Sequence, residues 1–261
     1  MTAGDGSARS RVSVAPLAVA FASAALVTGC AGGVPLLHPA HVLSPGRVSV
    51  GAGVAGHVEA TTNIAPKGPD HADTVLDALT VAPGVSPWGA GRIGIDGDNE
   101  AGISYLGRSF RVDGRHAFPV GPLHLSLGIG ASAVVPRPDD TLGKAYGGGA
   151  DVPVLLGWKS DAELYSLWFG PRAGFEILHG DALASALTDG GADDTFVPFS
   201  GKHIWVGGLV GSKVGFRSIH VALEVDVAYH FADGQFGVDG AQEASVGALT
   251  ITPSGALILT L

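Results

Sequence analysis

The stretch Ile219-His-Val-Ala-Leu-Glu-Val-Asp-Val-Ala-Tyr-His-Phe231 decides the fold of this chain. Its odd-numbered side chains are aliphatic or aromatic, whereas its even-numbered side chains are alanine, imidazole or carboxylate groups. A period of two places alternate residues on opposite faces of a β-strand, while a helix would mix both sets on every face. The stretch therefore predicts a strand with one apolar face and one polar face.

The same alternation recurs along the chain from residue 47 to the C-terminus. We predict about ten strands, at residues 47–60, 83–96, 100–107, 109–118, 122–135, 150–159, 162–178, 202–215, 217–231 and 247–261. The connections alternate between short turns and longer loops at 61–82, 136–149, 179–201 and 232–246, with the tight Gly107-Arg108 link as the exception. Short turns on one rim and long loops on the other are typical of membrane β-barrels. Within the first long loop, Ala72 to Leu79 could form a short helix outside the membrane.

Composition favours a sheet that faces lipid. Charged residues make up 15% of the 261 residues, hydrophobic residues make up 46%, and the mean hydropathy is +0.34. A soluble domain carries about 25% charged residues. No apolar run of about 18 residues occurs after residue 30, which argues against a membrane helix in the mature chain. The net charge of −9 argues against nucleic acid as a partner, because phosphate binding needs a basic face.

The polar faces of the predicted strands are small and rich in glycine. Examples are Ser49, Gly51 and Gly53 in the first strand, and Gly128 and Gly130 in the fifth. Small residues suit the interior of a narrow barrel, and a closed sheet pairs every backbone group that would otherwise be exposed to lipid. Residues 47–261 are therefore predicted to form an all-β domain, a single closed antiparallel up-and-down transmembrane β-barrel of about ten strands.

The N-terminus has the pattern of a processing signal. Arg9 and Arg11 precede an apolar stretch from Val12 to Val27, and the sequence Val27-Thr28-Gly29-Cys30 follows. That sequence resembles a bacterial lipobox. The resemblance implies a lipoprotein signal peptide at 1–29, cleavage before Cys30, lipidation of the Cys30 sulfur and a lipidated linker at 30–46. The alternatives are an ordinary secretory signal with an incidental cysteine, or an uncleaved N-terminal anchor.

The barrel pattern resembles the small outer-membrane β-barrels of Gram-negative bacteria, with an OmpA-like or opacity-like architecture. Aromatic residues near predicted strand ends match the interfacial girdles of that family: Tyr105, Trp158, Tyr165, Tyr229 and Phe231. The last strand alternates as in the family but ends in Leu261, where the family often has an aromatic residue. The resemblance implies an outer-membrane location, recognition by the outer-membrane assembly machinery, and contact with membrane lipid through Cys30 and the barrel exterior.

Charged side chains on the polar faces are expected to meet in the lumen. Glu100 and Glu163 are expected to point inward, and the predicted network comprises Arg92, Arg111, Asp113, Arg115, Arg172, Glu176, Glu224 and Asp226. Both signs are present because an unpaired buried charge is very costly. The alternative interpretation of this set is a proton or ion path.

We expect a structural or surface-presentation role, without an open pore, without a cofactor or metal site, and without catalysis. The Gly51 to Gly56 stretch matches a dinucleotide fingerprint, but a strand follows it where that motif needs a helix. One alternative is a soluble, lipid-anchored, lipocalin-like binding protein, which would turn Leu223, Val225 and Val227 inward. The other is an outer-membrane barrel hydrolase, whose candidate residues lie near one long loop: His179, Asp181, Ser185, Ser200 and His203.

Overall fold

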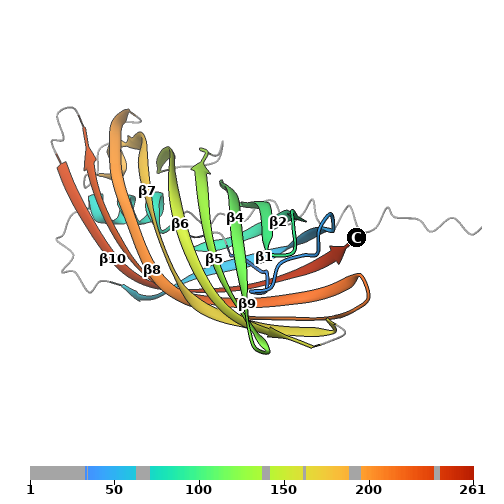
Figure 1. Ribbon diagram of the computed structural model, residues 1–261. Helices are drawn as coiled ribbons and strands as arrows, with labels where there is room; N and C mark the ends of the chain where they lie inside the picture. Colours follow the sequence, from blue (N-terminus) through green and yellow to red (C-terminus); the bar gives the residue numbers. More distant parts are fainter. Residues whose placement is uncertain are drawn as a thin grey trace, which may run out of the picture.

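Ten antiparallel strands close into a barrel in the computed structural model, which describes residues 33, 35–62, 71–136, 142–160, 163–187, 195–237 and 242–261. The strands are β1 (Val48–Thr62), β2 (Gly84–Gly94), β3 (Asn99–Leu106), β4 (Ser109–Val120), β5 (Leu123–Val134), β6 (Gly143–Lys159), β7 (Tyr165–Leu183), β8 (Phe196–Phe216), β9 (Ile219–Phe236) and β10 (Gln242–Thr260). Each strand pairs with its neighbours in sequence, and β1 pairs with β10 to close the ring (Figure 1). The predicted fold, an all-β closed up-and-down barrel, is confirmed. The predicted signal peptide and Cys30 lie outside the described residues.

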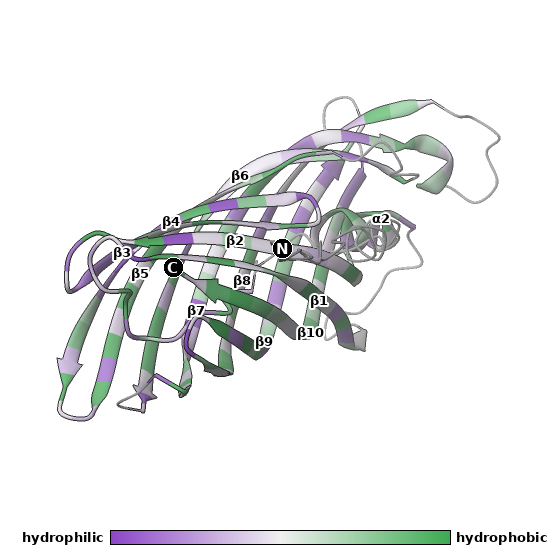
Figure 2. Cartoon of the chain, turned by 90° about the vertical axis from the view of Figure 1, so that its right-hand side faces the viewer, coloured by the Kyte–Doolittle hydropathy of each residue, from purple (hydrophilic) through white to green (hydrophobic). Residues whose placement is uncertain are grey.

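The strands divide their side chains between the two faces as the alternation predicts. In β9, Leu223 is 57% exposed on the outer face, whereas the neighbouring Glu224 is 1% exposed on the inner face. Val225 and Val227 also point outward. Figure 2 shows the same alternation of hydrophobic and hydrophilic residues along the strands. The outer surface is thus apolar, and the ionised side chains lie inside.

The strands are longer than predicted at one end of the barrel. β6, β8 and β10 begin at Gly143, Phe196 and Gln242, and β7 and β9 continue to Leu183 and Phe236. The predicted ends at residues 150, 178, 202, 231 and 247 are therefore wrong. The apolar alternation stops at these places because the outward positions become polar or glycine, but backbone pairing continues, as between Lys202 and Asp233.

The two rims of the barrel differ. We call the rim with the links after β2, β4, β6 and β8 the short-turn rim, and the opposite one the long-loop rim. Both ends of the barrel sequence reach the short-turn rim, where the backbone N–H of Leu261 donates to Val48 O at 2.8 Å. On the long-loop rim, β3 and β4 are joined by the tight link that the sequence predicts, with Gly107 at φ +58°.

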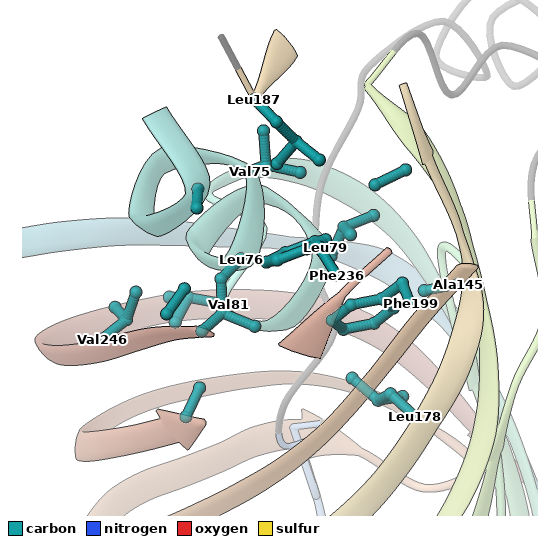
Figure 3. Packing of buried hydrophobic residues seen from close by; sticks show 14 of the residues in the cluster. Val75, Leu76, Leu79, Val81, Ala145, Leu178, Leu187, Phe199, Phe236 and Val246 are labelled. Atoms are coloured by element: carbon teal, nitrogen blue, oxygen red, sulfur yellow. The ribbon is translucent and has the colours of Figure 1, made fainter. Parts of the chain in front are cut away.

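A helix closes the long-loop end from within. α2 (His71–Thr80) buries Val75, Leu76 and Leu79 against inward-facing residues of the wall, including Phe199 and Phe236 (Figure 3). Figure 1 shows α2 at the end of the barrel away from the C-terminus. A 3-10 turn, η2 (Ala184–Ala186), follows β7. No helix in the described part of the chain is both long and apolar enough to cross a bilayer.

Candidate functional site

A chain of alternating charges lines the inner wall from β7 to β2. Asp151, on β6, accepts hydrogen bonds from Arg172 Nε at 2.9 Å and from Arg111 Nε at 2.7 Å. Arg111 Nη1 also donates to Asp113 at 2.5 Å. These four side chains are at most 4% exposed. One carboxylate thus holds two guanidinium groups from strands on either side of it.

The chain continues through two more shared carboxylates, Asp113 and Glu100. Arg92 Nη2 donates to Asp113 Oδ2 at 2.6 Å, and Arg92 Nε donates to Glu100. Arg115 Nη2 donates to the same Glu100 oxygen at 2.9 Å. Buried ion pairs are tolerated when both signs alternate and the remaining donors find acceptors. The predicted arginines Arg92, Arg111, Arg115 and Arg172 therefore share one continuous network with Asp113.

The predicted charge set needs one addition and one correction. Asp151 is central to the network but is absent from the predicted set, although the predicted strand at 150–159 includes it. Its register partners are Gly130, where a Cβ would meet Arg111 and Asp151, and Gly174, where a Cβ would meet the Trp205 ring. The signal that could have identified Asp151 is its place in the predicted strand next to the outward-facing Val152. Glu163, expected to point inward, lies in the β6–β7 link with its side chain 40% exposed and pairs with Lys159 at 2.7 Å.

The three other predicted acids lie on the inner wall, and two of them, Glu224 and Glu176, bind groups outside this network. Glu224 receives the N-terminal segment, which we define as residues 35–46. Its Oε1 accepts the Leu36 N–H at 2.7 Å, and its Oε2 accepts the Leu37 N–H at 3.0 Å and the Trp168 Nε1–H at 2.9 Å. Asp226 is buried two residues further along β9. The segment that the sequence suggests to be a plain linker thus runs through the lumen.

Further contacts hold the N-terminal segment by its main chain. Arg115 donates to the carbonyl oxygens of Pro39 and His41, and Trp88 Nε1 donates to Pro35 O at 3.0 Å. Glu100 accepts the Leu43 N–H at 2.8 Å. Leu36 and Leu37 also belong to a buried apolar cluster with Trp88 and Trp168. The network arginines and acids therefore position a stretch of backbone that fills the lumen.

The third acid, Glu176, anchors a row of imidazoles that the sequence does not reveal. His203 Nδ1 lies 3.1 Å from Glu176 Oε2, and His203 Nε2 lies 2.9 Å from His230 Nδ1. His230 Nε2 lies 2.8 Å from Thr250 Oγ1. His57, whose Nδ1 is 2.8 Å from Thr252 Oγ1, packs edge-on against His230. This row crosses adjacent strands, and the hydrogen bonds satisfy most of its buried ring nitrogens.

The candidate hydrolase residues do not form a catalytic arrangement. His179 and Ser200 are cross-strand neighbours that line a hollow of about 470 Å³ with Lys202, whereas His203 lies buried on the inner side of the wall. Within the set of His179, Asp181, Ser185, Ser200 and His203, all of them described, no hydrogen bond joins a serine to a histidine. The described residues also contain no group of three or more His, Cys, Asp or Glu side chains suited to hold a metal ion.

Comparison with known proteins gives structural similarity only. No family model matches the chain, and no curated protein sequence matches it. Among solved structures, the chain is similar to the crystal structure of Neisserial surface protein A, with 11% sequence identity, a TM-score of 0.31, and coverage of 82% of this chain and 95% of that one. It is also similar to the CymD monoaromatic hydrocarbon channel, with 8% identity, a TM-score of 0.25, and coverage of 84% of this chain and 89% of that one.

Proposed function

We propose that this protein is an integral outer-membrane β-barrel with a structural or surface-presentation role, whose lumen is closed to solutes and whose N-terminus is lipidated at Cys30. The observation that carries this proposal is the polarity of the wall, with aliphatic side chains outside and ionised side chains inside. A soluble lipocalin-like barrel has the opposite polarity, with an apolar cavity and a polar surface.

The extent of the apolar outer surface supports a bilayer as its solvent. Along β9, the outward residues are aliphatic or aromatic from Ile219 to Phe231, and then become Asp233 and Gln235. Twelve residue steps of about 3.3 Å, at a strand tilt of about 40°, correspond to roughly 30 Å along the barrel axis. The apolar band of membrane barrels is about 25 Å tall. A contiguous apolar surface of this size on a protein in water would favour aggregation.

Three layers inside the wall support a closed lumen. The N-terminal segment occupies the part of the lumen toward the short-turn rim, where Gly46 N donates to Gly94 O at 2.9 Å. The imidazole row and the charge network cross the inner wall. The helix α2 covers the long-loop end. A barrel of about ten strands is narrow enough for side chains to fill, and here a chain segment adds to them.

The test of this proposal is extraction and reconstitution of the full chain. After expression in a Gram-negative host, the protein should sediment with outer membranes, require detergent for extraction, and migrate faster on a gel before boiling than after it. Reconstituted in planar bilayers, it should give no stepwise conductance. Radiolabelled palmitate should enter the wild-type protein and not the Cys30→Ser variant.

Each arm of this experiment can contradict one part of the proposal. Release of the lipid-free Cys30→Ser protein in soluble form without detergent would contradict the membrane barrel. Reproducible conductance steps would contradict the closed lumen. Equal labelling of wild type and Cys30→Ser would contradict lipidation at that residue.

A further inference from the structure

The N-terminal segment carries two histidines into the lumen. His38 is 4% exposed and His41 is 6% exposed, so the wall buries both imidazoles. His38 Nδ1 lies 3.4 Å from Pro39 O, and its Nε2 has no hydrogen-bond partner among the described residues. The centre of the His41 ring lies 5.9 Å from that of His124, on β5. In the described part of the chain, no carboxylate lies within 4.0 Å of either ring to stabilise a proton on it.

Arginine and lysine side chains lie beside these two rings. A cavity of about 30 Å³, with room for about one water molecule, is lined by His38 and His41 together with Arg92, Arg115 and Lys213. A water molecule there could bond a neutral ring, but it could not neutralise a further positive charge. A protonated ring at this place would therefore be a buried cation among other cations, which is costly.

The acids near the segment already bind other groups. Glu100 accepts from Arg92 and Arg115, and Glu224 accepts main-chain N–H groups of the segment. Glu163 binds Lys159. The charged and titratable groups of the wall that surround the two histidines are Arg47, Arg92, Glu100, Arg111, Arg115, His124, Lys159, Glu163, Lys213, Arg217, His220 and Glu224.

We propose that protonation of His38 and His41 releases the N-terminal segment from its place in the lumen. In the docked segment both rings are neutral, whereas in a released segment they meet water and have the ordinary histidine pKa of about 6.5. The released state then binds more protons than the docked state, so docking weakens as the pH falls below about 6.5. At a pH of about 4.5, two units lower, the equilibrium constant for docking falls up to about 100-fold for each ring. The inference concerns docking alone and does not depend on lipidation at Cys30.

The experiment measures how fast a buried cysteine of the segment reacts at neutral and at acid pH. The parent protein is the full chain with Cys30→Ser and Leu37→Cys, folded in a neutral detergent and treated with 4,4′-dithiodipyridine, which reacts with thiols in acid as well. Asp98→Cys in the Cys30→Ser chain, at an exposed turn, gives a reference rate that corrects for the pH dependence of the thiol reaction. Between a pH of about 7.5 and one of about 4.5, we expect the corrected rate to rise at least about tenfold.

Histidine variants of this parent protein assign the response. The double variant His38→Gln/His41→Gln keeps neutral polar side chains and should show little change with pH. Each single variant should keep only part of the response, so the test stands even where the double variant fails to fold. His179→Gln removes an exposed histidine near the other rim and should respond to acid as the parent does.

Three results overturn the inference. The first is a corrected rate that does not change with pH in the folded parent protein. The second is an equal acceleration by acid in the parent and in all variants of His38 and His41, which is also the result expected if acid simply unfolds the barrel. The third is a response that is lost in Glu224→Gln but kept in the variants of His38 and His41, because it would place the titrating group at that acid.

Discussion

At the scale of single residues, the lumen depends on matching one carboxylate with the glycine opposite it. Asp151 holds Arg111 and Arg172 together, and its register partner Gly130 leaves the space for the Arg111–Asp151 pair. A Cβ atom on Gly130 would lie 2.5 Å from Arg111 Nε and from Asp151 Oδ1. The buried ion pair of Asp151 and the missing side chain of Gly130 therefore depend on each other at this point of the wall.

Removal of the shared carboxylate should be strongly destabilising. In Asp151→Ala, two buried guanidinium groups lose their common partner, and the free energy of unfolding should fall by about 3–5 kcal/mol. Denaturant titration in lipid vesicles measures this change. Asp233→Ala removes an exposed carboxylate that accepts a bond from Ser245 Oγ, and should change stability by less than about 1 kcal/mol. Similar losses of unfolding free energy in both variants would show that the buried network stabilises the barrel no more than an exposed carboxylate does.

The glycine opposite Asp151 gives a test by added size. Gly130→Ala should lower the free energy of unfolding by about 1–3 kcal/mol, because the new methyl group must displace the Arg111–Asp151 pair. Gly114→Ala is the matched control, since an added Cβ there meets no atom within 4 Å. Thermal unfolding measured through loss of the heat-modifiable gel band compares the two variants. Equal stability would contradict the packing argument.

At the scale of elements, two pieces of chain outside the sheet fill the barrel. The N-terminal segment is held mainly through its peptide groups by Glu224, Arg115 and Glu100. The helix α2 is held through apolar side chains at the opposite end. Polar main-chain contacts and apolar packing therefore secure the two ends of the lumen by different means.

Weakening of the Glu224 contacts should release the N-terminal segment. A cysteine introduced by Leu37→Cys, in a Cys30→Ser background, should be protected from a soluble thiol reagent because Leu37 is 1% exposed. Adding Glu224→Gln removes the charge from two main-chain hydrogen bonds and should accelerate labelling about tenfold or more. Glu176→Gln, which changes a buried acid bound to His203, is the control and should leave the rate unchanged. Equal rates in the two variants would contradict the role of Glu224.

The packing of α2 can be tested by truncation of its most buried side chain. Leu76 is fully buried among inward-facing wall residues, so Leu76→Ala should lower the stability of this end by about 2–5 kcal/mol. Thr74→Ala alters the exposed side of the same helix and should have little effect. Hydrogen exchange of the α2 amides should accelerate in Leu76→Ala and not in Thr74→Ala. Unchanged exchange in Leu76→Ala would show that α2 is not held by this packing.

At the scale of the whole molecule, the cost of a charged substitution on the outer surface should depend on its depth in a bilayer. Val225 lies near the middle of the outward apolar residues of β9, and Ile219 lies at their edge. An arginine at the bilayer midplane costs about 2–4 kcal/mol, whereas one near the interface costs about 0–1 kcal/mol. In vesicles, Val225→Arg should therefore be markedly less stable than Ile219→Arg. The same small effect in both variants would contradict a lipid-facing wall.

The sequence by itself determined the strands and their two faces, because both are local properties. The run from Ile219 to Phe231 has a period of two, and that period fixes which side chains share a face whatever the neighbours are. The outward facing of Leu223 and the inward facing of Glu224 were therefore predictable, and so was the inward facing of the predicted arginines. The ends of β6 to β10 were not, because pairing with neighbours extends these strands where the alternation has stopped.

Only the tertiary structure decided what the lumen contains. The segment at 35–46 has no periodicity. Its contacts with Glu224 and Glu100 join residues that lie 57 to 188 positions apart in the sequence. The same holds for Asp151 and for the imidazole row, each of which joins side chains from different strands. Closing the ring sets the register between strands, and register determines which inward side chains meet.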